Sequence, residues 1–189
     1  MASAKTLALL AVAHTYEVRD RKVLVLKPVI DTRFGKTTVA SRAGLSREAN
    51  LTLNADTVIP QDMVNGSSCV LVDEAQFLST FVVDQLREVA TGQNIPVLCY
   101  GLRTDFRSKL FEGSKRLLEV ADTIEEIKTT CTYCTKKAVF NLKAVDGAPT
   151  IDGDQVTVGA EELYVPTCPT HFYAKLQMTS TALSSACLS

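Results

Sequence analysis

The stretch Cys69-Val70-Leu71-Val72-Asp73-Glu74 runs from four apolar residues directly into two carboxylates. A short apolar run without polar alternation predicts a strand that is buried on both faces of a parallel sheet. Open α/β sheets bind their ligands at the carboxyl ends of such strands, which is where Asp73 and Glu74 would lie. One acid can hold Mg²⁺ and its neighbour can accept a proton, as in the Walker B arrangement of phosphoryl-transfer proteins. Taken alone, the stretch is equally compatible with a strand that ends in two solvated acids.

The segments around this strand alternate between helix and strand patterns. Apolar residues at helical spacing predict helices over Lys5–Arg19 and Thr80–Ala90, and apolar runs predict strands over Lys22–Pro28 and Asn94–Gly101. Such alternation predicts a parallel α/β sheet with right-handed crossovers. The polar segment 31–53, rich in Thr, Ser and Arg, is expected to be a mobile loop with short ordered pieces.

A pattern typical of metal sites follows in the last third of the chain. Cys131-Thr132-Tyr133-Cys134 and Cys168-Pro169-Thr170-His171 give C-x2-C and C-x2-H, two tight pairs that can point at one ion. Three thiolates and one imidazole fill a tetrahedral Zn²⁺ shell and leave no open position, so we predict a structural zinc site. A redox C-x-x-C is the weaker interpretation, because the second pair supplies the matching ligands.

The residues around the metal pattern predict a different architecture from the first part of the chain. Residues 137–145 and 154–158 favour a β-hairpin around Asp146-Gly147. The Ser- and Thr-rich residues 178–189 favour a disordered tail. A small zinc-ribbon-like β lobe is therefore expected beside the α/β core.

Overall composition argues against several classes of protein. The net charge of −1 offers no basic excess for nucleic-acid phosphates, and the hydrophobic fraction of 46% is that of a globular protein. The chain contains no apolar run of about 18 residues, so no membrane-spanning helix is expected. Its six cysteines do not suggest a disulfide scaffold, which favours a reducing, cytoplasmic location. We expect neither nucleic-acid nor membrane partners.

A Walker B strand normally acts with a phosphate-binding loop of the form G-x-x-x-x-G-K-[ST], set between a strand and a helix. The chain opens Met1-Ala2-Ser3-Ala4-Lys5-Thr6, directly before the expected first helix. Lys5 suits phosphate oxygens, Thr6 suits Mg²⁺, and a helix N-terminus suits an anion. By spacing alone the match is weak, because the first glycine and the preceding strand are absent.

Several motifs in this order resemble the thymidine kinases of the cellular and bacterial type, which combine a P-loop core with a zinc-bound lobe. The resemblance covers the chain from Met1 to about Lys175. It is carried by the phosphate-loop, Walker B and zinc motifs above. The further motifs that carry it are Asp31-Thr32-Arg33-Phe34, Ser41-Arg42-Ala43-Gly44, Tyr100-Gly101-Leu102-Arg103-Thr104-Asp105-Phe106 and Val158-Gly159-Ala160-Glu161-Glu162-Leu163-Tyr164.

The resemblance implies transfer of the γ-phosphate of ATP to the 5′-hydroxyl of thymidine, giving dTMP. In that case Glu74 corresponds to the general base, while Lys5 and Arg33 offset the charge on the transferred phosphoryl group. The resemblance further implies ATP- or Mg²⁺-binding roles for Met1, Ala2, Ser3, Ala4, Thr6, Asp31, Asp73 and Gln76.

The resemblance also implies how the nucleoside is held. Phe106 and Phe111 match positions that pack against thymine, Met1 matches a position beneath its methyl group, and Leu102 matches a further pocket position. Tyr164 and the backbone of Val158, Gly159 and Ala160 match a lasso loop that closes over the base. A homo-oligomer, either a dimer or a tetramer, is expected on the same ground.

This chain departs from the family pattern at its N-terminus and in the lasso. Ala4 and Ala160 stand where glycine is usual, and the family's first strand is missing, so we expect a member that is shortened at its N-terminus. We predict a RecA-like P-loop core over residues 1–128, a zinc-binding lobe with the lasso over 129–177, and the tail over 178–189. Two alternatives stay open: a P-loop kinase with another acceptor, and a catalytically impaired, zinc-stabilised nucleotide-binding remnant.

Overall fold

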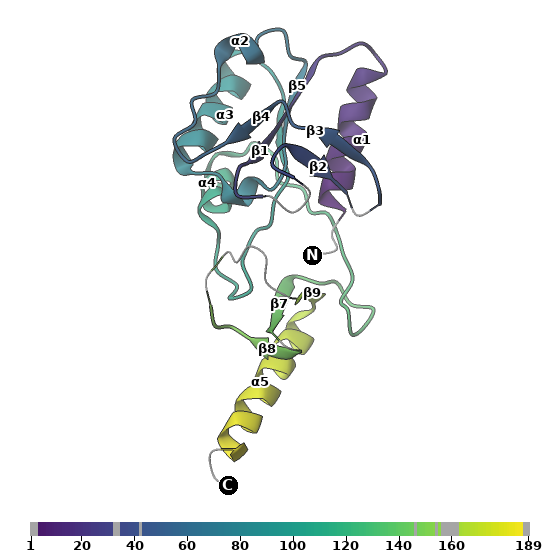
Figure 1. The fold of residues 1–189 in the computed structure, drawn as a ribbon, viewed down its shortest axis with the longest axis vertical. Helices are drawn as coiled ribbons and strands as arrows, with labels where there is room; N and C mark the ends of the chain where they lie inside the picture. The colour runs from purple at the N-terminus through teal and green to yellow at the C-terminus, as the bar shows by residue number, and fades with distance from the viewer. Residues whose placement is uncertain are drawn as a thin grey trace. The chain divides into compact units, whose positions relative to one another are not determined.

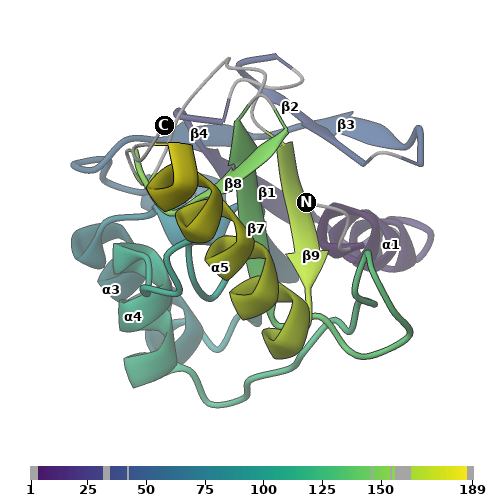
Figure 2. The ribbon, with the colours of Figure 1, turned by 90° about the horizontal axis from the view of Figure 1, so that it is seen from below.

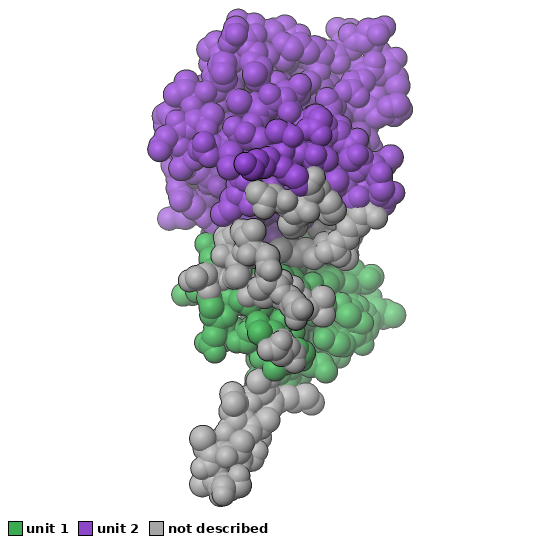
Figure 3. Space-filling view, in the orientation of Figure 1, with its two compact units in different colours: residues 1–3, 104–109, 126–189 green, residues 4–103, 110–125 purple. Residues whose placement is uncertain are grey.

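The computed structural model describes residues 4–31, 35–41, 43–145, 147–153, 155 and 163–186. They divide into two compact units (Figure 3). The large unit comprises residues 4–103 and 110–125, and the small unit comprises residues 104–109 and the described residues from 126 onward. The sequence predicts one boundary near residue 128, whereas the structure also assigns Thr104–Lys109 to the small unit.

The large unit is an α/β structure (Figure 1). Its helical segments are α1 (Lys5–Glu17), α2 (Gln61–Val64), the 3-10 turn η1 (Ala75–Phe77), α3 (Thr80–Gly92) and α4 (Glu112–Val120). Its strands are β1 (Val23–Pro28), β2 (Thr38–Ala40), β3 (Ser46–Glu48), β4 (Leu51–Leu53), β5 (Cys69–Val72) and β6 (Val97–Cys99). Strands β4, β1, β5 and β6 form one sheet in that order, and every pair in it is parallel. This confirms the predicted fold class.

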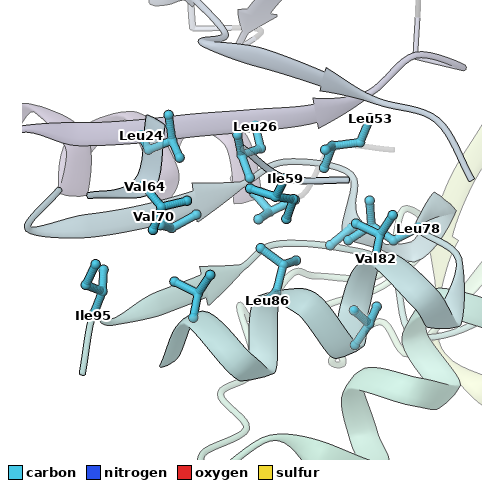
Figure 4. Close-up of a cluster of buried hydrophobic side chains, with 14 residues drawn as sticks. Leu24, Leu26, Leu53, Ile59, Val64, Val70, Leu78, Val82, Leu86 and Ile95 are labelled. Atoms are coloured by element: carbon cyan, nitrogen blue, oxygen red, sulfur yellow. The ribbon is translucent and has the colours of Figure 1, made fainter. Parts of the chain in front are cut away.

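Alternate residues of the central strands β1 and β5 enter two separate cores. One face of the sheet packs Val25 and Leu71 against α1, where Leu9 is fully buried. The other face packs Leu24, Leu26, Val70 and Val72 against the apolar side of α3. Figure 4 shows Leu24, Leu26 and Val70 in this core together with Val82 and Leu86. All four residues of β5 are buried, which explains why its sequence is apolar without alternation. Helices on both faces therefore fix the strand that carries Asp73 and Glu74.

Strand β4 lies in the main sheet, although the sequence predicts a loop over residues 31–53. Asn50, directly before β4, attaches this strand to β1 by hydrogen bonds to the β1 backbone, one of them through its side chain. Asn50 Oδ1 accepts a hydrogen bond from the N–H of Val25 at 2.8 Å, and the Asn50 N–H donates to the Val25 carbonyl at 2.7 Å. Here a side-chain oxygen takes the place of a backbone carbonyl as hydrogen-bond acceptor, and such a substitution produces no strand-like alternation of apolar residues in the sequence.

Helix α4 was not predicted, because Gly113 and Ser114 in its first turn have low helix propensity. Its backbone lies very close to η1. A Cβ at Gly113 would lie 2.5 Å from the Ala75 carbonyl oxygen and 2.8 Å from that of Leu78. Only glycine permits this approach, so the residue that weakens the helix locally is required by packing.

The small unit contains an antiparallel sheet in the order β8-β7-β9, and Figure 2 shows α5 alongside it. Its elements are β7 (Phe140–Val145), β8 (Ala148–Thr150), β9 (Leu163–Thr167) and α5 (Pro169–Ala186). Phe172 of α5 stacks on Phe140 with ring centroids 4.7 Å apart. A hairpin connects β7 to β8, with Val145 paired to Ala148, so its turn falls between these two residues as predicted. Residues 154 and 156–158 of the second strand that the sequence predicts lie outside the described residues.

Helix α5 continues through Ala186, where the sequence predicts a disordered tail from residue 178. The segment from Met178 to Ala186 contains neither proline nor glycine, so a helix that is already nucleated by packing can propagate along it. Among the helices that the structure describes, none combines the length and apolarity needed to span a membrane.

Candidate active site and metal centre

Asp73 lies at the carboxyl end of β5 and meets the first turn of α1. Thr6 Oγ1 donates a hydrogen bond to Asp73 Oδ2 at 3.0 Å, with Oδ1 at 3.3 Å. Burial raises the pKa of Asp73 to about 6, and the negative charge of Glu74 adds to the rise. Hydrogen bonds from Thr6 and the backbone N–H of Glu74, together with the charge of Lys5, act in the opposite direction. A buried carboxylate whose negative charge is only partly compensated is well suited to bind a metal cation.

The start of α1 carries positive charge where helices usually carry negative charge. Lys5 is its first residue and is buried, Ala4 provides no side-chain cap, and the first turn contains no acidic residue. The N–H groups of the first turn and the N-terminal end of the helix macrodipole already carry partial positive charge. A lysine there is therefore unfavourable for the isolated helix. The arrangement favours an anion at this end of the helix.

Glu74 adopts a left-handed backbone conformation, with φ 47° and ψ 38°. For a residue with a Cβ this costs on the order of 1–2 kcal/mol, and such strain concentrates at functional sites. The side chain is buried, and Gln76 Nε2 donates to Glu74 Oε2 at 2.6 Å. Two buried carboxylates therefore follow one another at a strained strand end, which is where the sequence predicted them.

Asp31 is held by Lys27, a residue that the sequence analysis missed. Lys27 ends the apolar run of β1, yet its side chain is buried completely and its Nζ lies 3.2 Å from Asp31 Oδ2. Its ammonium also donates to the carbonyls of Thr38 at 2.9 Å and Gly35 at 3.3 Å. Lys27 thus fixes Asp31 and the polar segment after it. The only sequence signal was a lysine inside a strand that is otherwise apolar.

Leu102 and Phe111 also belong to the large unit. The Leu102 N–H donates to Gln76 Oε1 at 2.9 Å, and the Leu102 carbonyl accepts from Ser114. Phe111 is buried, and its ring packs edge-on against Phe77 with centroids 5.6 Å apart. These contacts connect both predicted nucleoside-binding residues to the segment that follows Glu74.

The small unit brings together Phe106 and Tyr164, two residues predicted to bind the nucleoside. Their ring centroids lie 6.2 Å apart, and Lys143 Nζ lies 4.8 Å from the Phe106 centroid. The loop that carries Phe106 is organised by buried Asp105. Its Oδ1 accepts from the N–H groups of Arg107 and Lys109 at 2.8 and 2.9 Å.

Cys131, Cys134, Cys168 and His171 converge as the sequence predicted. Their ligand atoms all lie within 4.8 Å of one another. Cys134 Sγ is 3.8 Å from Cys168 Sγ, and His171 Nδ1 is 3.3 Å from Cys168 Sγ and 3.6 Å from Cys131 Sγ. A tetrahedral zinc ion with Zn–S bonds of about 2.3 Å would hold its ligand atoms roughly 3.5–3.8 Å apart. The quartet therefore fits zinc.

Local hydrogen bonds favour the thiolate form of one ligand, Cys131. Burial raises the pKa of the Cys131 thiol, but hydrogen bonds from the N–H groups of Cys168 and Tyr133, together with those from the thiols of Cys134 and Cys168, lower it to about 6. The Tyr133 N–H lies 3.4 Å from Cys131 Sγ. Cys69 of β5 is buried in the core that packs against α1, and Cys99 of β6 packs against the core on the α3 side.

Several predicted site residues lie outside the part of the chain that the structure describes. These are Met1, Ala2, Ser3, Arg33, Val158, Gly159 and Ala160. The assignments made for them remain predictions.

Comparison with known proteins gives a consistent answer. A family model described as "Thymidine kinase" matches residues 1–172. The chain is 44% identical over 181 residues to a thymidine kinase of Lactiplantibacillus plantarum, covering 95% of this chain and 94% of that protein. It is 45% identical over 177 residues to thymidine kinases of Enterococcus faecalis and Lactococcus lactis, covering 92% of this chain and 90% and 93% of those proteins.

The chain belongs to the thymidine kinase family. This confirms the resemblance inferred from the motifs, and it supports a kinase, that is, a phosphotransferase, activity. The buried acids at the end of β5 and the lysine at the start of α1 are the features of this thymidine kinase family member that suit phosphoryl transfer.

Proposed function

We propose that this protein transfers the γ-phosphate of ATP to the 5′-hydroxyl of thymidine and thereby makes dTMP. The observation that carries the proposal is the site at the end of β5. There the Thr6–Asp73 hydrogen bond stands beside Glu74, which is buried in a strained conformation. Family membership supplies the kinase activity, and these residues supply the chemistry that such a transfer needs.

In this proposal Glu74 is the general base. Its carboxylate accepts the proton of the 5′-hydroxyl while the oxygen forms a bond to the γ-phosphorus and the bond to ADP breaks. Burial keeps bulk water away from this carboxylate. The proton that Glu74 accepts therefore comes from the acceptor hydroxyl and not from a water molecule. A general base contributes about 10²–10⁴-fold to the rate of such steps.

Residues of α1 and of the strand ends bind the phosphates and the metal. Thr6 and Asp73 would hold Mg²⁺, with Asp31 nearby in the proposed site, and Lys5 would contact the phosphates. When bound, Mg²⁺ neutralises charge on the β- and γ-phosphate oxygens. Met1, Ala2, Ser3 and Ala4 are proposed to complete the phosphate loop, and Arg33 to offset charge on the transferred group.

Thymidine recognition is assigned to aromatic residues and to the lasso. Phe106, Phe111 and Tyr164 would pack around the base, with Met1 and Leu102 lining the pocket. Backbone groups of Val158, Gly159 and Ala160 would bond to the edge of the base. Such bonds would reject cytidine, because it presents a donor where thymidine presents an acceptor.

Zinc, oligomeric state and location complete the proposal. The quartet of Cys131, Cys134, Cys168 and His171 would hold a structural Zn²⁺ with no open position. We further propose a homo-oligomer, either a dimer or a tetramer. A cytoplasmic location suits an unoxidised zinc thiolate site.

Phosphorylation assays with thymidine, deoxyuridine and deoxycytidine test the proposal directly. Turnover of thymidine with ATP and Mg²⁺, and loss of that turnover in Glu74→Gln, is the expected result. Turnover only of an acceptor that is not a pyrimidine nucleoside would instead favour another P-loop kinase. Absence of turnover together with ATP binding would favour the impaired remnant.

A further inference from the structure

We propose that Gln76 is the positioning residue that orients the Glu74 carboxylate for proton transfer. The inference rests on the proposed role of Glu74 as base, and it assigns Gln76 a function other than contact with ATP or Mg²⁺. The Gln76 side chain is about 1% exposed, and both ends of its amide are engaged. Nε2 donates to Glu74 Oε2 at 2.6 Å, and Oε1 accepts from the Leu102 N–H at 2.9 Å.

The Leu102 N–H determines which end of the amide faces Glu74. A backbone N–H can only donate, so the group opposite it must be the amide oxygen. The amide NH₂ then points at the carboxylate, to which it can only donate. The reversed amide would place a donor against the Leu102 N–H and an acceptor against Glu74, which is unfavourable at both ends. The network therefore has one orientation.

Glycines on two sides fix the position of Gln76. A Cβ at Gly101 would lie 2.9 Å from Gln76 Oε1 and 3.0 Å from its backbone nitrogen. A Cβ at Gly113 would lie 3.0 Å from the Gln76 carbonyl oxygen. Real Cβ contacts are rarely so short, so the segment that follows β6 and the first turn of α4 both approach the turn that carries Gln76 as closely as glycine allows.

This arrangement fixes the direction of one carboxylate oxygen of Glu74. Because Oε2 is held by Gln76, rotation of the carboxyl group is restricted, and the direction of Oε1 is set as well. In the proposed reaction the proton of the acceptor hydroxyl moves to the Glu74 carboxylate, and Gln76 neither gains nor loses a proton. Orienting a base in this way raises the rate of the chemical step without adding to substrate affinity.

Gln76→Met tests the inference, because methionine has a similar length and makes neither hydrogen bond. We expect kcat to fall about 10–100-fold, the usual effect of losing a group that orients a catalytic residue. The KM values for ATP and thymidine should change less than about twofold, since uniform binding is untouched. A rise in the KM for ATP with unchanged kcat would overturn the proposal and restore the nucleotide-binding role.

A double-mutant cycle with Glu74→Gln separates this inference from the proposed function. If Gln76 acts through Glu74, the variant with both substitutions should be no slower than Glu74→Gln alone. Independent, additive losses would contradict the inference. Wild-type turnover in Glu74→Gln would instead refute Glu74 as base, which is a different outcome from wild-type turnover in Gln76→Met alone.

Two glycine substitutions provide a matched pair. Gly101→Ala inserts a Cβ against Gln76, and we expect it to lower kcat as Gln76→Met does. Gly92→Ala, at the end of α3, meets nothing within 4 Å and should leave kcat unchanged. Thermal unfolding identifies which variants are folded, and Gly101→Ala carries the test if Gln76→Met does not fold. Wild-type kcat in folded Gln76→Met, or in folded Gly101→Ala, overturns the inference.

Discussion

Thr6 Oγ1 donates a hydrogen bond to Asp73 Oδ2 over 3.0 Å, which joins residues that lie 67 positions apart in the sequence. The bond connects the first turn of α1 to the carboxyl end of β5 across the edge of the parallel sheet. A hydroxyl and a carboxylate in this position form one side of a site for a metal-bound phosphate. The hydrogen bond from Thr6 offsets only part of the free-energy cost of burying the Asp73 carboxylate, because the pKa of Asp73 remains raised.

Asp73→Asn should therefore stabilise the protein in the absence of nucleotide and metal, while it removes activity. The folded-state pKa of Asp73 is about 6 and its ordinary value is 3.8, so the folded state binds this proton more tightly than the unfolded state. The contribution of Asp73 to stability is thus fully present below pH 4 and is lost as the pH rises to about 6. The melting temperature of Asp73→Asn relative to wild type should rise over this interval and stay constant above it.

Calorimetry at several pH values between 4 and 8 measures this difference. An Asp73→Asn advantage that does not change with pH would contradict the explanation. Thr6→Val is the companion variant, because it removes a hydrogen bond that favours the charged carboxylate. It should move the pH at which stability is lost upward.

Glu74→Gly should be more stable than Glu74→Ala, although both lose the proposed base. Glycine adopts the left-handed conformation at position 74 without strain, whereas alanine retains a cost of about 1 kcal/mol. Denaturant unfolding gives the difference directly. Glu88, which is exposed within α3, provides the control. There the alanine variant should have a free energy of unfolding about 1 kcal/mol higher than that of the glycine variant. If the alanine variant were the more stable one at both positions, the backbone of Glu74 would not be strained.

Part of this architecture could be read from the sequence because the deciding signals are local. The apolar run of β5 ends in its two acids within six residues, and both metal pairs use a two-residue spacing. The strand end and the quartet were therefore predicted with the correct residues. Helix α1 was also predicted to begin at Lys5, as the structure has it.

The features that were missed depend on contacts between distant segments. The Gln76 amide is held by Leu102, 26 positions away, and β4 joins the sheet through the side chain of Asn50. Gly113 weakens α4 in isolation and is needed only because η1 lies against it. Nothing in the local pattern reveals such partners. Charge buried at the end of an apolar strand, as at Lys27, is the one such signal that sequence reasoning could have used.

Lys27→Met should destabilise the protein strongly, because it leaves buried Asp31 without the ammonium at 3.2 Å. Removing one partner of a buried ion pair costs about 3–5 kcal/mol. Adding Asp31→Asn should recover part of that loss, since the buried negative charge is then gone. Urea denaturation of the single and double variants measures both effects.

Lys22→Met is the matched control for this prediction. Lys22 also donates to backbone carbonyls, those of Met63 and Asn65, but it is exposed. Its loss should cost only about 1 kcal/mol. Equal losses at positions 22 and 27 would mean that burial of the Lys27–Asp31 pair contributes little.

Metal analysis of the purified protein should find about one zinc ion per chain, as expected for four ligands in a closed shell. Cys134→Ser should release this ion and destabilise the small unit, because Cys131 and Cys134 are linked through the metal to Cys168 and His171 at the start of α5. Cys99→Ser changes a thiol of β6 outside the quartet, so the zinc content should remain that of the wild type. Zinc retained in full by Cys134→Ser, or lost in Cys99→Ser, would refute the assignment of the quartet.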